Sequence, residues 1–193
     1  MGAEASSPGE TPAPPTSKMA LTSSLHQAVE SGDLETVEKL LETSGQDVNY
    51  RDAGSSRKTL LMIAAREGHK DIVDFLIQKG ADATLVGNGG WNAVLHASWQ
   101  GHSRVLEKLL SSGGPLDVQE KKFGHTALAK AVLFKHPDCV SVLLEHGASL
   151  DVRGHDGKTA KELAVDKKHT DIVRLIEKDE KKRGELNYVK RET

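Results

Sequence analysis

The chain has 193 residues, of which 37% are hydrophobic and 28% are charged, and its formal net charge at pH 7 is -2. This length suits one ordinary domain, and the balanced charge argues against the basic surface that is typical of nucleic-acid-binding proteins. The single cysteine excludes an internal disulfide, and no apolar run approaches the ~20 residues of a membrane-spanning helix. We therefore expect a cytoplasmic or nuclear protein that binds no nucleic acid.

The first 20 residues contain four prolines among small polar residues, so we expect residues 1–20 to be disordered. Residues 1–6 match the Met-Gly-x-x-x-Ser/Thr pattern for myristoylation of Gly2, although a start at Met19 would remove the motif. One acyl chain gives only marginal, reversible membrane binding, and no cysteine or basic cluster lies nearby to supply a second signal. We therefore expect no stable membrane association.

Residues 21–178 repeat with a period of 33 or 34 residues. Three columns of equivalent positions keep this register: four histidines, a set of Thr or Asn, and a set of glycines. A period of this length is typical of stacked supersecondary units. The columns are His69, His102, His136 and His169; Thr59, Asn92, Thr126 and Thr159; and Gly80, Gly113 and Gly147.

Each unit predicts two short helices joined by a tight turn. The first helix begins after the Thr column, as at Thr59, because Thr is a favoured N-cap. The second carries apolar residues at i, i+1, i+4 and i+5, as in 72–77. Gly80 and its equivalents fall where a helix end needs a left-handed residue, and Pro137 fits the first position of a helix.

These features resemble the ankyrin repeat. The longest match runs over 56–69 and continues to Gly80-Ala81-Asp82, and shorter matches at 25–28, 124–128 and 157–160 open further units. The resemblance implies an all-α ankyrin repeat solenoid of helix-turn-helix units joined by short hairpin-like loops. We expect repeats at about 21–49, 50–85, 86–118, 119–152 and 153–178, and a charged tail at 179–193 that extends the last helix and then frays.

Some positions depart from the family pattern. Lys135 and Lys168 replace glycine in the turn between the helices, which we expect to lower local stability without altering the fold. Asn49 resembles the asparagine that is hydroxylated in some ankyrin proteins.

No residue pattern indicates catalysis. The histidine column could suggest a metal site, but stacked helices lie roughly 8–10 Å apart, whereas zinc needs ligands within about 2.0–2.3 Å. We therefore expect these histidines to stabilise turns. Cys139 stands in an apolar column and is expected in the core, and no nucleophile, acid pair or phosphate loop stands out. The sequence predicts no catalytic residue, no cofactor and no metal.

Large apolar residues occupy columns that are charged or polar in other repeats. Trp91 aligns with Lys58, and Trp99 aligns with Arg66. The resemblance places these columns on the hairpin tips and the concave surface of the inner helices. Tryptophan is enriched at interface hot spots, so we expect a partner-binding patch there. The alternative is that the rings pack on one another or on the adjacent loop. The expected partner-binding residues are Trp91, Trp99, Phe123, His125, Leu133, Phe134, Arg66 and Glu67.

The resemblance implies a non-catalytic protein–protein interaction module that acts as an adaptor or scaffold through the concave face and finger tips. A narrower alternative is a direct inhibitor of a partner enzyme such as a kinase, similar to the ankyrin-type inhibitors of cyclin-dependent kinases. In either case we expect a monomer with a protein partner.

Overall fold

The computed structural model describes residues 18–52 and 57–192, with side chains described for 21–52 and 57–185. The myristoylation pattern at Gly2 and the part of the expected disordered segment that precedes residue 18 lie outside the described residues. The first helix begins at Lys18, three residues before the expected boundary of the repeats.

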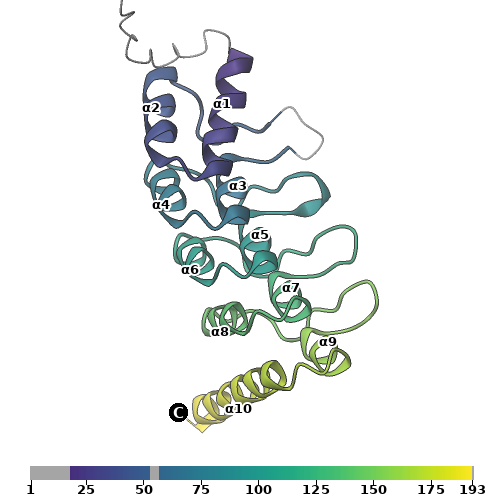
Figure 1. Ribbon diagram of the computed structural model, residues 1–193. Coiled ribbons are helices and arrows are strands. Elements are labelled where there is room, and N and C mark those ends of the chain that lie inside the picture. Colours follow the sequence, from purple (N-terminus) through teal and green to yellow (C-terminus); the bar gives the residue numbers. More distant parts are fainter. Residues whose placement is uncertain (1–17, 53–56, 193) are drawn as a thin grey trace, which may run out of the picture.

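The described helices form five antiparallel pairs that stack side by side (Figure 1). The first helices of the pairs contact one another in one row, and the second helices contact one another in a parallel row. The expected all-α repeat solenoid is confirmed. The pairs are α1 (Lys18–Ser31) with α2 (Leu34–Ser44), α3 (Leu60–Glu67) with α4 (Lys70–Gln78), α5 (Ala93–Gln100) with α6 (Ser103–Ser111), α7 (Ala127–Leu133) with α8 (Pro137–Glu145), and α9 (Ala160–Asp166) with α10 (Thr170–Glu192).

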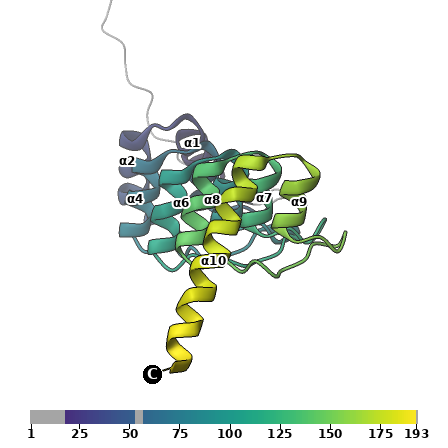
Figure 2. The same ribbon diagram turned by 90° about the horizontal axis from the view of Figure 1, so that it is seen from below.

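Loops project from the row of first helices on one side of the stack (Figure 1). We call the surface formed by these loops and by α1, α3, α5, α7 and α9 the inner face. One loop contains a short 3-10 turn, η1 (Asn88–Gly90), directly before α5. The last helix, α10, continues beyond the stacked rows, as the view from below shows (Figure 2).

The predicted N-caps are confirmed. The side chain of each Thr or Asn in the column accepts a hydrogen bond from the backbone N–H three residues later, which satisfies one of the otherwise unpaired donors at the helix start. Thr159 and Glu162 complete a reciprocal capping box. The four bonds are Met62 N to Thr59 (3.3 Å), Leu95 N to Asn92 (2.8 Å), Ala129 N to Thr126 (3.3 Å) and Glu162 N to Thr159 (3.3 Å).

The histidine column stabilises the turns, as expected. A ring N–H of each histidine donates to a carbonyl oxygen of the preceding repeat, so the column links neighbouring units. The bonds run from His69 to Glu30 O (3.1 Å), His102 to Arg66 O (3.0 Å), His136 to Trp99 O (3.0 Å) and His169 to Val132 O (3.0 Å). The glycine of the preceding turn leaves room for the ring: at Gly101 an added Cβ would lie 2.6 Å from His136 Nδ1.

The turn before the last repeat differs. Lys135 takes the place of glycine and still adopts a left-handed conformation, with φ of 56°. The histidine that follows, His169, bonds through Nδ1 rather than Nε2 and reaches the carbonyl of Val132.

Asparagine or aspartate side chains bridge successive loops. Asn49 Oδ1 accepts a hydrogen bond from the backbone N–H of Asp82 (2.8 Å), and its Nδ2 donates to the carbonyl of Gly80 (3.4 Å). Asp117 makes the equivalent bond with Ser149 N (3.0 Å) two repeats later. In the structure Asn49 therefore has a loop-joining contact, and its resemblance to a hydroxylated asparagine stays a resemblance.

The hydrophobic core is one continuous layer between the two rows of helices. Small residues in the first helices, such as Ala64, Ala97 and Ala131, are fully buried and allow close approach. Cys139 is buried in this layer, as predicted, and its burial raises the pKa of the thiol to about 12.

Candidate aromatic interface

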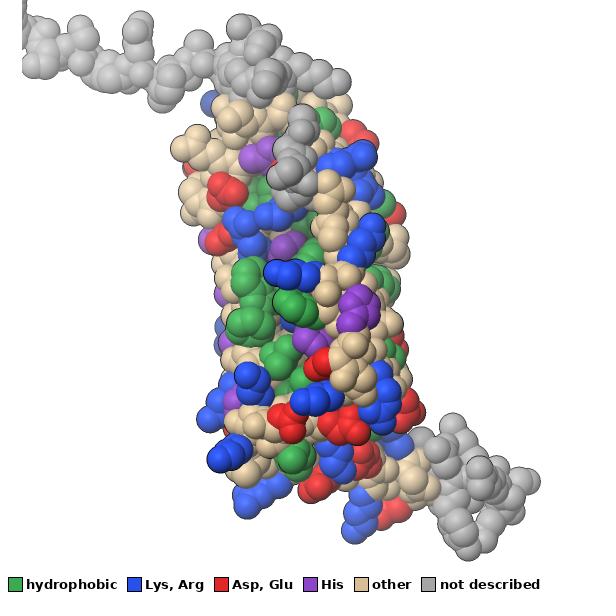
Figure 3. All heavy atoms as spheres, turned by 90° about the vertical axis from the view of Figure 1, so that its right-hand side faces the viewer, with side chains coloured by type: hydrophobic (Ala, Val, Ile, Leu, Met, Phe, Trp, Pro, Cys, Tyr) green, Lys and Arg blue, Asp and Glu red, His purple; other side chains and the backbone are tan. Residues whose placement is uncertain are grey.

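Aromatic rings form a connected cluster on the inner face of the third and fourth repeats. Trp91 directly precedes the N-cap of α5, and Trp99 lies in its last turn. Their ring centres are 5.5 Å apart in an edge-to-face arrangement, and Phe134 meets Trp99 edge-on at 6.0 Å. A band of apolar side chains lies midway along the face that carries the loops (Figure 3). We call Trp91, Trp99, Phe123, Leu133 and Phe134 the aromatic face.

The residues of the aromatic face combine mutual packing with exposure. Phe123 is 47% exposed and Phe134 is 50% exposed, whereas the two tryptophans and Leu133 are half-buried. The tryptophans pack on one another and still reach the surface. The expected exposure is wrong for His125, which is only 8% exposed because it lies stacked against Phe123, with ring centres 5.8 Å apart.

Arg66 and Glu67 lie in the preceding repeat and are engaged with each other. The Nε of Arg66 donates to Glu67 Oε1 at 2.5 Å, and its Nη2 lies 3.4 Å from Glu30 Oε1. The charge of Arg66 is therefore compensated, and these two residues form a polar rim rather than part of the aromatic cluster.

A buried cation holds the cluster together. Lys130 Nζ lies 5.0 Å from the centre of the Trp91 ring and 5.4 Å from that of Phe123, and it pairs with Glu120 Oε1 at 3.3 Å. Glu120 also accepts hydrogen bonds from the backbone N–H groups of Lys122 (2.7 Å) and Phe123 (2.9 Å). Burial acts to raise the pKa of Glu120, but these donors and the charge of Lys130 outweigh it, so the pKa lies below its ordinary value.

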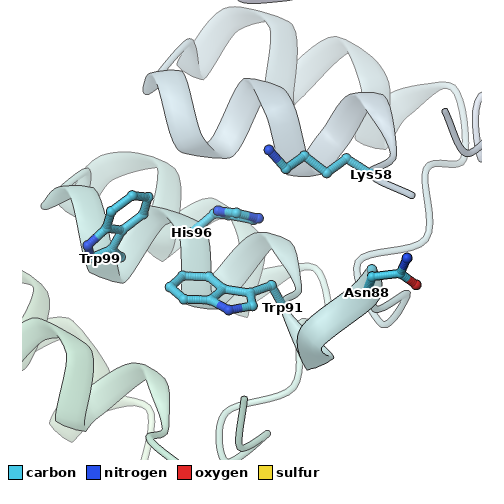
Figure 4. Close-up of a pocket in the computed structure, with 6 residues that line it drawn as sticks. Lys58, Asn88, Trp91, His96 and Trp99 are labelled. Carbon is cyan, nitrogen blue, oxygen red and sulfur yellow. The ribbon is translucent and has the colours of Figure 1, made fainter. Parts of the chain in front are cut away.

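A hollow of about 310 Å³ opens beside the two tryptophans. Trp91, Trp99 and His96 line it from the third repeat, Gly87 and Asn88 from the loop before α5, and Lys58 from the preceding repeat (Figure 4). His96 is 5% exposed, and its Nδ1 has no hydrogen-bond partner. Burial, with the nearby charges of Lys58 and Arg66, lowers the pKa of His96 to about 3, so the ring is neutral at pH 7.

Sequence reasoning missed three residues that shape this region, namely His96, Lys130 and Glu120. A signal existed for the first two: they share a column with Ile63 and Leu163, and a polar residue in an otherwise apolar column indicates a buried polar group. Glu120 had no such signal, because its burial depends on how its loop folds back over the fourth repeat.

The chemistry of this region suits binding. In the part of the chain that the structure describes, no three His, Cys, Asp or Glu side chains converge as metal ligands would. Across the same residues, no helix has the length and apolar character needed to span a membrane. The aromatic rings, the neutral imidazole and the lysine ammonium group are the contacts that this face offers to another molecule.

Comparison with known proteins agrees with the fold. The family described as ankyrin repeats (3 copies) matches residues 25–119 and 97–184. The chain is 30% identical over 161 residues to tyrosine-protein kinase HTK16 of Hydra vulgaris, covering 83% of this chain and 21% of that protein. It is 36% identical over 91 residues to human Inhibitor of Bruton tyrosine kinase, covering 47% of this chain and 7% of that protein. It is 28% identical over 157 residues to mouse ankyrin repeat and SAM domain-containing protein 6, covering 81% of this chain and 17% of that protein. The chain thus spans about a fifth or less of the length of these relatives.

Proposed function

Because the chain belongs to the ankyrin-repeat family, whose repeats form protein–protein interaction modules, we propose that it is a non-catalytic adaptor or scaffold that captures a protein partner on its aromatic face. The observation that carries this proposal is the pair of half-exposed rings, Phe123 and Phe134, flanking the partly open tryptophan pair. Family membership alone supplies only the general role.

Two physical features make this face suited to binding. Its rings stand on short helices and a loop that are held by the buried Lys130–Glu120 pair, so little conformational entropy is lost when a partner binds. Aromatic anchors surrounded by polar groups are the arrangement typical of interface hot spots, where one truncation costs ~2 kcal/mol or more. Arg66 and Glu67 provide such a polar rim.

The test compares partner capture by the wild-type chain and by the double variant Phe123→Ala, Phe134→Ala. These side chains are exposed, so the variant should unfold at nearly the wild-type temperature while losing the partner. Val165→Ala is the matched control, because Val165 is 56% exposed in the last repeat, outside the aromatic face. Trp91 is a poor choice for this test, since its ring supports His96, Trp99 and Lys130.

Affinity capture from cells followed by mass spectrometry gives the readout. Partners held by the wild type and by Val165→Ala, but absent from the double variant, are the expected result. Undiminished capture by the double variant would show that the partner binds elsewhere.

A second candidate function is direct inhibition of a partner enzyme, which we propose on the similarity to the protein named Inhibitor of Bruton tyrosine kinase. The name describes that protein; here it motivates an assay. If a captured partner is a kinase, its turnover should fall when the wild-type chain is added and be unaffected by the double phenylalanine variant. Unchanged turnover in the presence of a saturating amount of the chain would leave the adaptor role and exclude the inhibitor.

We also propose that the chain acts as a monomer in the cytoplasm or nucleus. Light scattering during size-exclusion chromatography tests the first point, and imaging of the tagged protein in its native cell tests the second. A dimer that buries the aromatic face would contradict both the monomer and the site.

A further inference from the structure

We propose that the hollow beside Trp91 and Trp99 binds a short acidic segment of the protein partner, with one large apolar side chain against the indoles and a neighbouring carboxylate on Lys58. This inference rests on the proposed function, since it names the chemistry that the aromatic face selects.

The size of the hollow limits what can enter it. Ligand pockets in proteins span about 300–1,000 Å³, so a space of about 310 Å³ suits one or two side chains rather than a whole cofactor. Its walls are largely aromatic, which favours a large apolar group. An extended peptide that places one such group in the hollow would leave its flanking residues over the lip formed by Gly87 and Asn88.

The arrangement of contacts explains why the hollow stays open. Trp91 packs against His96 (5.0 Å between ring centres), Trp99 and Lys130, all in its own or the following repeat. Among the described residues of the preceding repeat, Lys58 alone lines this space (Figure 4). The equivalent position of the third repeat carries Trp91. A flexible lysine does not fill the volume next to the indole.

The positive charge of Lys58 favours an acidic peptide over a basic one. The other two cations nearby are compensated, Lys130 by Glu120 and Arg66 by Glu67 and Glu30. Lys58 has no carboxylate within 4.0 Å among the described residues, although its side chain is partly buried. Partial burial and the charge of Arg66 lower the pKa of Lys58, and the carboxylates of Asp52, Glu30 and Glu67 offset this only in part. A carboxylate from a partner would offset this unfavourable environment, whereas a basic segment would worsen it.

His96 adds a directional contact. Its Nδ1 is buried without a partner, and an unpaired buried polar atom is costly unless another group bonds to it. The imidazole is neutral at pH 7, so one ring nitrogen donates and the other accepts, which suits a peptide group. The hollow thus combines an apolar wall, a neutral hydrogen-bonding group and a lysine that forms no ion pair within 4.0 Å among the described residues.

The first test selects peptides from a random dodecapeptide library displayed on phage, using the folded full chain as the target. The expected consensus is a large apolar residue next to Asp or Glu, and selected phage should not bind the Lys58→Glu variant. A consensus without carboxylates, equal binding to Lys58→Glu, or no enrichment over an unrelated ankyrin protein would overturn the proposal.

The second test titrates the chain with a synthetic peptide of the selected sequence. The chain contains only two tryptophans, Trp91 and Trp99, so intrinsic fluorescence reports directly on the hollow. Lys58→Ala should weaken binding about tenfold or more, because one charge-assisted contact contributes at least that factor. Lys58→Arg, which keeps the charge, should retain most of the affinity.

Lys158→Ala is the matched control, since Lys158 stands in the same column three repeats after Lys58, outside the aromatic face, and pairs with Asp166. It should bind the peptide like the wild type. Equal affinity for Lys58→Ala and Lys158→Ala would overturn the assignment to Lys58. If the phenylalanine double variant loses the cellular partner while Lys58→Ala keeps it, the adaptor role stands and the acidic-segment inference fails.

Discussion

The ammonium group of Lys130 lies 5.0 Å from the centre of the Trp91 ring, so a buried cation of the fourth repeat covers an indole of the third. The same group pairs with Glu120, whose loop carries Phe123. One lysine therefore connects two repeats and a projecting loop at the site where we expect a partner to bind.

Replacement of Lys130 by Met should lower the free energy of unfolding by about 3 kcal/mol, because it leaves the Glu120 carboxylate buried without its counter-charge. Urea denaturation followed by circular dichroism measures the change. Lys121→Met, at an exposed neighbouring position, is the control and should stay within about 0.5 kcal/mol of the wild type. A loss of less than 1 kcal/mol for Lys130→Met would indicate that the pair contributes little.

The same pair gives a prediction for pH. The pKa of Glu120 in the folded chain lies below its ordinary value of 4.5, so the carboxylate stabilises the fold above that pH and the contribution disappears as pH falls through the folded-state pKa. The wild type should therefore lose more stability than Glu120→Gln between pH 5 and about pH 3. Other carboxylates, such as Asp33 and Glu162, also have lowered pKa values, so both proteins lose stability in acid. The quantity that tests Glu120 is therefore the difference between the plots of unfolding free energy against pH for the wild type and Glu120→Gln. Parallel curves would contradict the role assigned to Glu120.

Two glycines with the same backbone conformation separate the cost of strain from the cost of a lost contact. Gly101 and Gly113 have φ of 85° and 86°. A Cβ added at Gly101 would collide with His136, whereas a Cβ added at Gly113 would meet no atom within 4 Å. Gly113→Ala should cost about 1 kcal/mol for the left-handed backbone, and Gly101→Ala should cost at least about 1 kcal/mol more. Thermal unfolding of both variants checks this. Equal losses would mean that the histidine contact adds nothing to stability.

Asn92 stands where the second, fourth and fifth repeats carry Thr. Its Oδ1 caps α5, but its buried Nδ2 has no hydrogen-bond partner. We expect Asn92→Ala to cost about 1 kcal/mol through loss of the cap, and Asn92→Thr to preserve or raise stability because the cap remains and the unpaired donor is removed. Urea midpoints of the two variants measure the difference. A larger loss for Thr than for Ala would show that the amide group has a role beyond capping.

The repeat architecture was predictable from the sequence because the features that produce it are local. Thr59 and its equivalents cap helices through bonds three residues away, and Gly80 and its equivalents end helices through their own left-handed backbone. These requirements recur every 33 or 34 residues, so the period itself predicted stacked helix pairs. The aromatic face was located in the same way, by comparing residues within a column.

The sequence by itself determined the helix pairs, their caps, the histidine-linked turns and the columns that reach the inner face. Only the tertiary structure decided how side chains distant in the sequence meet: that Lys130 covers Trp91, that His125 stacks against Phe123, and that Lys58 lies opposite the tryptophans with no carboxylate within 4.0 Å among the described residues. The physical reason is that caps and turns depend on neighbours a few residues away. Burial, ion pairing and open volume depend instead on side-chain packing between units more than 30 residues apart.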